Sequence, residues 1–139
     1  MAKYEFINCL VHKYDKDAGI KIKSPADIYN EMKDIKDASR EVCVCFHLDT
    51  KNVVIAREII SIGTLNASLV HPREVFRSAI INNSNSIIIA HNHPSGDITP
   101  SGEDLSVCKK LHLVADIIGI KLRDFVIIGS NDYQSVDTI

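Results

Sequence analysis

The chain alternates between short runs of β-branched and aromatic residues and segments whose apolar positions recur every three or four residues. The first pattern is typical of strands and the second of amphipathic helices. The runs predict strands over residues 4–14, 41–48, 53–62, 87–90, 121–128 and 133–136. Helical spacing predicts helices over residues 25–36 and 101–118, and a third that opens at residues 71–74 and ends before a polar connector at 82–86. This order indicates an α/β fold, in which a mixed β-sheet is flanked by helices.

Local signals mark several of these boundaries. Ser24 and Pro25 form a strong helix start, with serine as the cap and proline at the first helical position. Residues 49–52 and 129–132 are polar turns, and each is expected to join two strands into a hairpin. Gly119 is expected to end the last helix.

The most informative stretch begins at residues 87–90, an apolar run that predicts a fully buried central strand. His91 and His93 emerge where that strand ends. Side chains at i and i+2 of an extended segment point the same way, so the two imidazoles can share one cation. Asp104 is the best candidate for a third ligand, because the Pro/Gly-rich loop 94–100 lets the chain turn back toward the strand end.

Two histidines and one carboxylate are a ligand set of catalytic zinc, in which the fourth position stays open for water. A second interpretation of Asp104 stays open. Residues 101–104, Ser-Gly-Glu-Asp, also resemble a capping box, in which the aspartate only satisfies amides at the start of a helix. The two histidines, taken alone, are also compatible with ordinary loop residues.

Composition narrows the class of protein. The 139 residues, 45% of them hydrophobic, predict one globular domain over residues 1–139. The net charge of −2 and the isoelectric point of about 6.3 exclude a global basic field of the kind that concentrates nucleic acid. We expect a cytoplasmic chain, because no charged-then-apolar leader is recognisable and no apolar run approaches the roughly twenty residues needed to span a bilayer.

Cys9, Cys43, Cys45 and Cys108 contain no Cys-x-x-Cys pair, which predicts reduced thiols. Cys43 and Cys45 stand at i and i+2 of an apolar run and could in principle bind metal. We expect them to be small buried hydrophobes instead.

The string from His91 to Asp104, HNHPSGDITPSGED, resembles the signature H-x-H-x(7)-S-x(2)-D of the JAB/MPN metalloenzyme superfamily, with Ser101 at the serine position. The upstream stretch GTLNASLVHPREVFRSAI is similar to the RadC family within that superfamily. The resemblance covers roughly residue 24 to the C-terminus. It implies a curved mixed sheet with helices against it, similar to the cytidine deaminase architecture. Longer members of the family also carry an N-terminal helix-hairpin-helix domain, for which we expect no counterpart in this sequence.

The resemblance also implies roles for particular residues. His91, His93 and Asp104 would hold about one zinc ion per chain. The superfamily uses a glutamate on the strand after the first helix as the base, and Glu41 fits that position, with Glu58 as the alternative. Either glutamate is also compatible with a solvated residue at a strand end.

Ser101 would donate a hydrogen bond to the oxyanion formed in hydrolysis, and its competing role is helix capping. Asn92, between the ligands, is expected to point to the opposite face and to brace the loop. His71 is expected to start a helix rather than to serve as a fourth ligand.

Three functions from different classes are compatible with these residues. The first is a zinc-dependent hydrolase that cleaves a peptide or isopeptide bond in a peptide or protein substrate, as JAMM members of the superfamily do. The second is a DNA-repair-associated protein that binds DNA or repair partners, after the label of the RadC family. The third is a metal-stabilised interaction module without turnover. An oligomer is compatible with each, and no membrane partner is expected.

Overall fold

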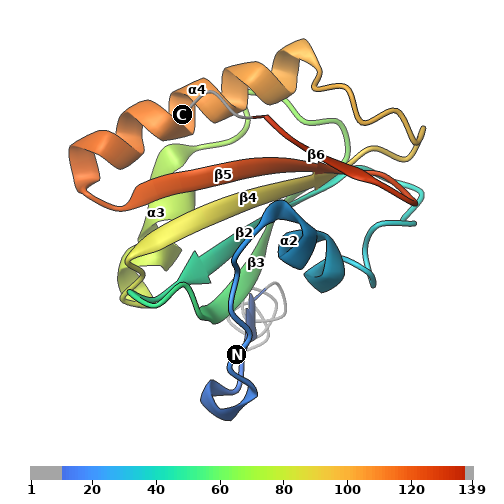
Figure 1. Ribbon diagram of the computed structural model, residues 1–139. Coiled ribbons are helices and arrows are strands. Elements are labelled where there is room, and N and C mark those ends of the chain that lie inside the picture. Colours follow the sequence, from blue (N-terminus) through green and yellow to red (C-terminus); the bar gives the residue numbers. More distant parts are fainter. Residues whose placement is uncertain (1–10, 137–139) are drawn as a thin grey trace, which may run out of the picture.

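A mixed six-stranded sheet runs through the part of the chain that the computed structural model describes, residues 11–136 (Figure 1). Its strands are β1 (Val11–Lys13), β2 (Val42–Leu48), β3 (Val54–Ile62), β4 (Ser86–Asn92), β5 (Lys121–Ile128) and β6 (Tyr133–Ser135). The helices are the short 3₁₀ turn η1 (Lys16–Ala18), α2 (Pro25–Glu31), α3 (Pro72–Ile81) and α4 (Gly102–Ile118). This architecture confirms the predicted α/β class and is consistent with the JAB/MPN fold.

The strand order is β1-β3-β2-β4-β5-β6, and only β4 and β5 run parallel. Helix α4 makes the crossover between these two strands, as a parallel pair requires. Every residue of β2 and of β4 is buried. Their near-continuous apolar sequences follow from this position at the centre of the sheet, where both faces are covered.

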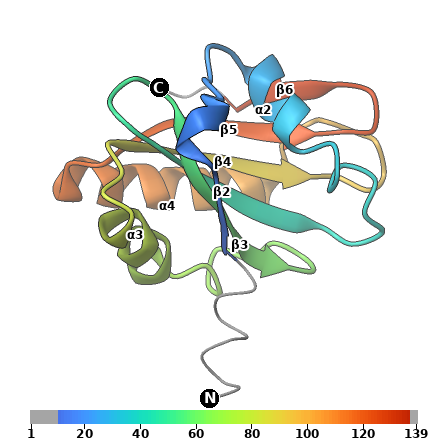
Figure 2. The ribbon, with the colours of Figure 1, turned by 90° about the horizontal axis from the view of Figure 1, so that it is seen from below.

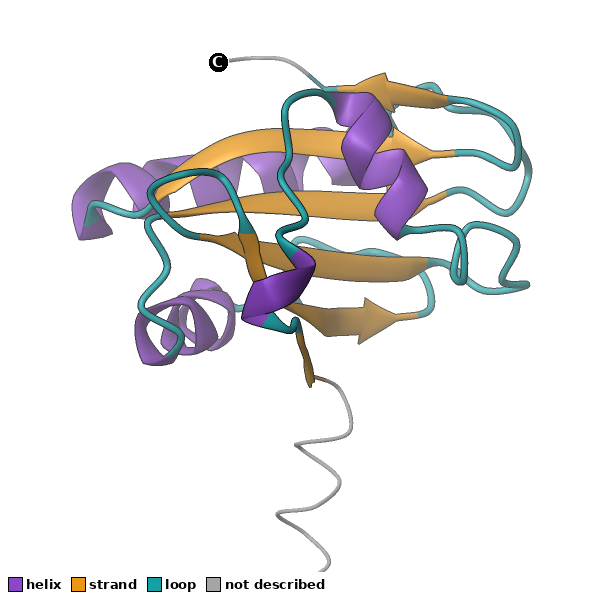
Figure 3. Ribbon diagram, turned by 60° about the horizontal axis from the view of Figure 1, so that its bottom comes forward, coloured by secondary structure: helices purple, strands orange, loops and turns teal. Residues whose placement is uncertain are grey.

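Helices cover both faces of the sheet. Figure 2 shows α3 and α4 on one side of the strands and α2 on the other, and in Figure 3 α2 lies in front of the sheet and α4 behind it. Alternate residues of one strand therefore enter different cores. In β2, Cys45 packs on the α3 and α4 side, whereas Val44 and Phe46 pack on the α2 side.

Several predicted boundaries differ from the observed ones. Helix α2 ends at Glu31 rather than at residue 36, because the chain continues in tighter turns, such as the one closed by the Ile35 amide and the Met32 carbonyl. Met32 and Ile35 are still buried, so the helical spacing predicted their burial correctly and the helix length wrongly. Strand β4 extends to Asn92, which places His91 inside the strand.

The other strand predictions were right to within a residue or two of their ends. Strands β2 and β3 each begin one residue later than predicted, and β6 ends one residue earlier. Of the first predicted strand, residues 11–13 form β1, Tyr14 lies beyond it, and residues 4–10 lie outside the described residues.

The predicted burial of Cys43 and Cys45 is confirmed, and the described cysteines form no disulfide, as predicted. Cys43, Cys45 and Cys108 are buried in the core on the α3 and α4 side of the sheet. Cys9 lies outside the described residues. No helix between residues 11 and 136 combines the length and the apolar character needed to cross a membrane.

Gly119 ends α4 as predicted and adopts a left-handed conformation, with φ of 86°. A side chain is disfavoured there because its Cβ meets the following carbonyl. We expect Gly119→Ala to lower the free energy of unfolding by about 1 kcal/mol. Chemical denaturation measures this, with the Gly102→Ala variant as the control because Gly102 has no positive φ and open space around it. Equal stability of the two variants would contradict the prediction.

Candidate metal centre

The histidine pair stands at the end of the central strand. His91 is the penultimate residue of β4, and the backbone amide of His93 continues the extended path by donating to the Ile128 carbonyl at 2.9 Å. Both rings therefore lie on the same side of the sheet, as predicted, with their centroids 5.1 Å apart and their planes nearly perpendicular.

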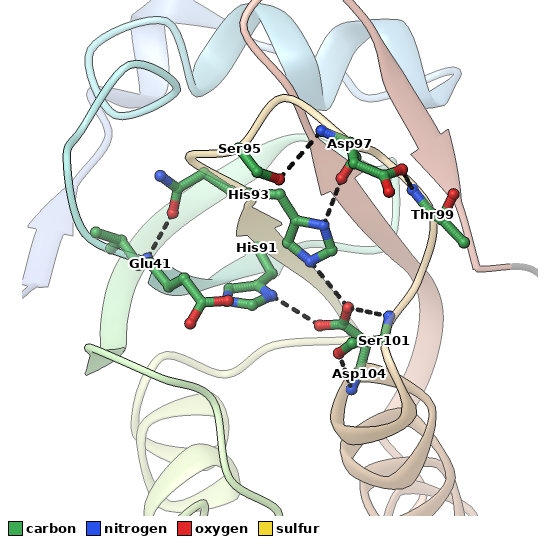
Figure 4. A network of polar contacts seen from close by, with 10 residues as sticks. Glu41, His91, His93, Ser95, Asp97, Thr99, Ser101 and Asp104 are labelled. Atoms are coloured by element: carbon green, nitrogen blue, oxygen red, sulfur yellow. Dashed lines mark hydrogen bonds and ion pairs between the residues drawn. The ribbon is translucent and has the colours of Figure 1, made fainter.

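Asp104 reaches both histidines from the first turn of α4 (Figure 4). Its Oδ1 lies 2.7 Å from His91 Nδ1, and its Oδ2 lies 2.9 Å from His93 Nε2. The same carboxylate accepts a hydrogen bond from the Ser101 amide at 2.7 Å, and the Asp104 amide donates to the Ser101 hydroxyl at 3.0 Å. The two interpretations left open for Asp104 are therefore compatible, since the capping box turns the carboxylate toward the rings.

Asp104 is ionised at neutral pH despite its burial. Its side chain is 0% exposed, and burial alone would raise its pKa. Hydrogen bonds from His91 and Ser101 and the charge of His91 outweigh this effect and lower the pKa to about 2. The site thus holds a fixed negative charge between two imidazoles.

Glu41 approaches the pair from the opposite side. It immediately precedes β2, and its Oε1 lies 3.6 Å from His91 Nε2, with the side chain 29% exposed. Ligand atoms of Glu41, His91 and His93 all lie within 4.8 Å of one another. These three residues can therefore hold a metal ion, with Asp104 in contact with both imidazoles.

The hydrogen bonding of the rings fits a bound cation. His93 Nδ1 lies 2.8 Å from the Asp97 carbonyl, which can only accept, so the ring donates there and in its neutral form turns an Nε2 lone pair toward the Asp104 carboxylate. Two acceptors that face each other at this distance need a shared proton or a metal ion that both of them bind. His91 Nε2, on the side of Glu41, is buried and has no hydrogen-bond partner among the described residues.

A cavity of about 610 Å³ opens beside these groups. Glu41, His93 and Ser101 line it together with the loop that follows the histidines. The Ser101 hydroxyl accepts from the Asp104 amide, and a side-chain hydrogen bond from Ser101 also helps to lower the pKa of the Asp104 carboxyl. Ser101 therefore caps α4 and lines the cavity, and its hydroxyl donates to a molecule there by exchanging this bond to Asp104.

The structure does not bring the other candidates to the histidine pair. Glu58 lies on β3, 4.0 Å from His47 Nε2, and burial raises its pKa although a hydrogen bond with Ser78 of α3 opposes the rise. His71 is the exposed N-cap residue of α3, as predicted.

Neither the role of Asp97 nor the connection between Asn92 and Glu41 was predicted from the sequence. The Asp97 backbone carbonyl orients His93, and the Asp97 carboxylate accepts from the Thr99 amide at 2.9 Å, which lowers the pKa of Asp97. The Asp-x-Thr pattern at residues 97–99 was the available signal for this turn. Asn92 hydrogen-bonds the chain on both sides of Glu41, and so it braces the approach to β2 rather than the loop after the histidines.

Comparison with known proteins agrees with this architecture and site. A family model described as RadC-like JAB domain matches residues 22–138, so the protein is an α/β domain of the JAB/MPN class. Within that class, the chain belongs to the RadC-like family.

Several curated relatives carry the name UPF0758 protein. One from Methanosarcina mazei is 47% identical over 117 residues, which are 84% of this chain and 51% of the relative. One from Staphylococcus haemolyticus is 47% identical over 123 residues, covering 88% of this chain and 54% of the relative. One from Desulforamulus reducens is 50% identical over 116 residues, covering 83% and 51% respectively. The chain therefore spans about half the length of these curated relatives.

Proposed function

We propose that the protein is a zinc-dependent hydrolase that cleaves a peptide or isopeptide bond. The observation that carries this proposal is the convergence of His91, His93, Asp104 and Glu41 beside one cavity. Imidazole and carboxylate are ligands that zinc takes in catalytic sites. Metalloproteases occur in the JAB/MPN superfamily, which agrees with this choice of reaction.

In the proposal His91, His93 and Asp104 hold the ion. A bound zinc ion supplies Lewis acidity that lowers the pKa of water from near 16 to roughly 7. The carboxylate of Glu41 accepts the proton of the attacking water and passes it to the leaving amine. Its partial exposure at the cavity wall suits this role, because the group must reach both solvent and substrate.

Ser101 donates a hydrogen bond to the oxyanion that forms on the carbonyl under attack. We expect Ser101→Ala to lower kcat about 100-fold, since such a donor stabilises the transition state more than the substrate. Loss of the cap is expected to cost about 1 kcal/mol of stability as well. Ser101→Thr keeps both functions of the hydroxyl and is the control. A normal kcat in Ser101→Ala would remove Ser101 from the mechanism.

An unbiased screen tests the reaction. The zinc-loaded protein is incubated with a peptide library and with lysine isopeptide-linked substrates, and the products are identified by mass spectrometry. We expect cleavage that disappears after chelation and returns with zinc. A zinc-loaded protein that cleaves none of these substrates would contradict the proposal and favour an interaction module.

A further inference from the structure

We propose that Asn92 is a positioning residue that fixes Glu41 against the histidine pair. The inference rests on the proposed function, in which Glu41 moves the proton. It concerns the only residue between the two histidines, and it assigns that residue a role distinct from metal binding.

The side-chain amide of Asn92 joins the chain on both sides of Glu41. Its Oδ1 accepts a hydrogen bond from the Val42 amide, and its Nδ2 donates to the Arg40 carbonyl at 3.0 Å. Asn92 is 0% exposed, so water does not compete for either bond. One planar group thus holds the peptide units before and after the glutamate.

We call the two hydrogen bonds of the Asn92 side chain the Asn92 clamp. It lies at the end of the pairing between β2 and β4. The pairing between β2 and β4 ends with Cys43 opposite His91, and Glu41 lies two residues before that pair. The Glu41 carbonyl accepts from the Gly63 amide at 2.8 Å, which ties it to the end of β3. The Asn92 side chain adds to this strand pairing two hydrogen bonds, one to the Val42 amide and one to the Arg40 carbonyl.

The chemistry of the amide makes asparagine the residue that fits. The side chain at position 92 must accept a hydrogen bond from the Val42 amide and donate one to the Arg40 carbonyl at the same time. Aspartate is isosteric with asparagine but has no donor when ionised, and alanine offers neither group. Because Asn92 is bonded directly to His91 and His93, the clamp sets the distance between Glu41 and the two rings, including the 3.6 Å between Glu41 and His91.

The test compares Asn92→Ala and Asn92→Asp with a matched control at the other end of β4. Ser86 is also 0% exposed, and its hydroxyl accepts from Arg123 Nε at 3.0 Å, far along the strand from the histidines. Both Asn92 variants are expected to keep a full complement of zinc and to lose about 10- to 100-fold in kcat, with KM nearly unchanged. Ser86→Ala is expected to keep a normal kcat.

A double-mutant cycle separates positioning from general damage. If Asn92 acts through Glu41, adding Asn92→Ala or Asn92→Asp to Glu41→Gln lowers kcat no further. Loss of zinc or a normal kcat in both Asn92 variants would overturn the inference. So would a double variant in which the Asn92 substitution lowers the kcat of Glu41→Gln by the same factor as it lowers that of the parent protein. Use of two variants keeps the test decisive if one of them does not fold.

A second readout does not depend on hydrolysis, so failure of the proposed function is distinguishable from failure of this inference. The carboxyl carbon resonance of Glu41, assigned in glutamate-labelled protein by its absence in Glu41→Gln, reports the surroundings of that group. We expect this resonance to shift in Asn92→Ala and Asn92→Asp and to keep its position in Ser86→Ala. We also expect the Val42 amide hydrogen to exchange faster with solvent in Asn92→Ala. An unchanged resonance and an equally protected Val42 amide would overturn the clamp even if no substrate is ever cleaved.

Discussion

Glu41→Gln is expected to retain about one zinc ion per chain and to lower kcat by a factor of about 10² to 10⁴. The amide has nearly the shape of the carboxylate but cannot accept the proton of the attacking water. Because Glu41 lies at the cavity wall and is partly exposed, the substitution is expected to leave folding unchanged. Steady-state kinetics with a substrate from the library screen and metal analysis of the same preparation measure the two effects.

Glu58→Gln is the matched control for this prediction. It makes the same chemical change on the neighbouring strand, where the carboxylate lies near His47 rather than near the histidine pair. We expect a normal kcat in this variant. Loss of activity in Glu58→Gln with normal activity in Glu41→Gln would reverse the assignment of the base. Loss of zinc in Glu41→Gln would instead make Glu41 a ligand, which the short distances among Glu41, His91 and His93 permit.

The choice between the two glutamates shows what the sequence could not decide. Glu41 begins the first strand of a predicted hairpin and Glu58 lies within its second strand, and apolar periodicity places neither beside His91. Register places Glu41 rather than Glu58 near the histidine pair. Strand β4 pairs with β2 so that His91 lies opposite Cys43, two residues from Glu41, whereas Glu58 lies opposite Cys45 on the next strand. Cross-strand register depends on tertiary packing, which single-sequence patterns do not report.

The parts of the site within one local segment were predictable. The i and i+2 spacing fixed both histidines on one side of a strand, and the capping pattern from Ser101 to Asp104 fixed the start of α4. The extent of the elements was less predictable: α2 stops early in tight turns, and β4 runs on through His91. Such ends depend on hydrogen bonds to distant partners, as the bond from the His93 amide to the Ile128 carbonyl illustrates.

The role of Asn92 could not be predicted from the sequence either, because it too depends on hydrogen bonds to partners that are distant along the chain. Alternation along the strand predicted correctly that its side chain would not join the two histidines. Its partners, Arg40 and Val42, lie about fifty residues earlier in the chain, and only the folded sheet brings them together.

Asp104→Ala is expected to abolish metal binding. Asp104 is buried, ionised and in contact with both imidazoles, so its removal takes away a fixed negative charge that touches both histidines. We expect zinc affinity to fall by more than the roughly 10- to 100-fold that is typical for a residue outside the ligand set. Metal analysis after dialysis against zinc, followed by competition with a chelator, measures the content and the affinity.

Loss of the helix cap accompanies this change and needs its own control. Ser101→Ala removes the partner hydroxyl of the capping box and leaves the carboxylate in place. His71→Ala removes an exposed histidine away from the site and tests nonspecific zinc binding. If both controls keep about one zinc ion per chain and Asp104→Ala keeps none, the carboxylate itself holds the ion. If Asp104→Ala binds zinc as tightly as the parent protein, Glu41 supplies the carboxylate ligand, and Asp104 serves only to orient His91 and His93.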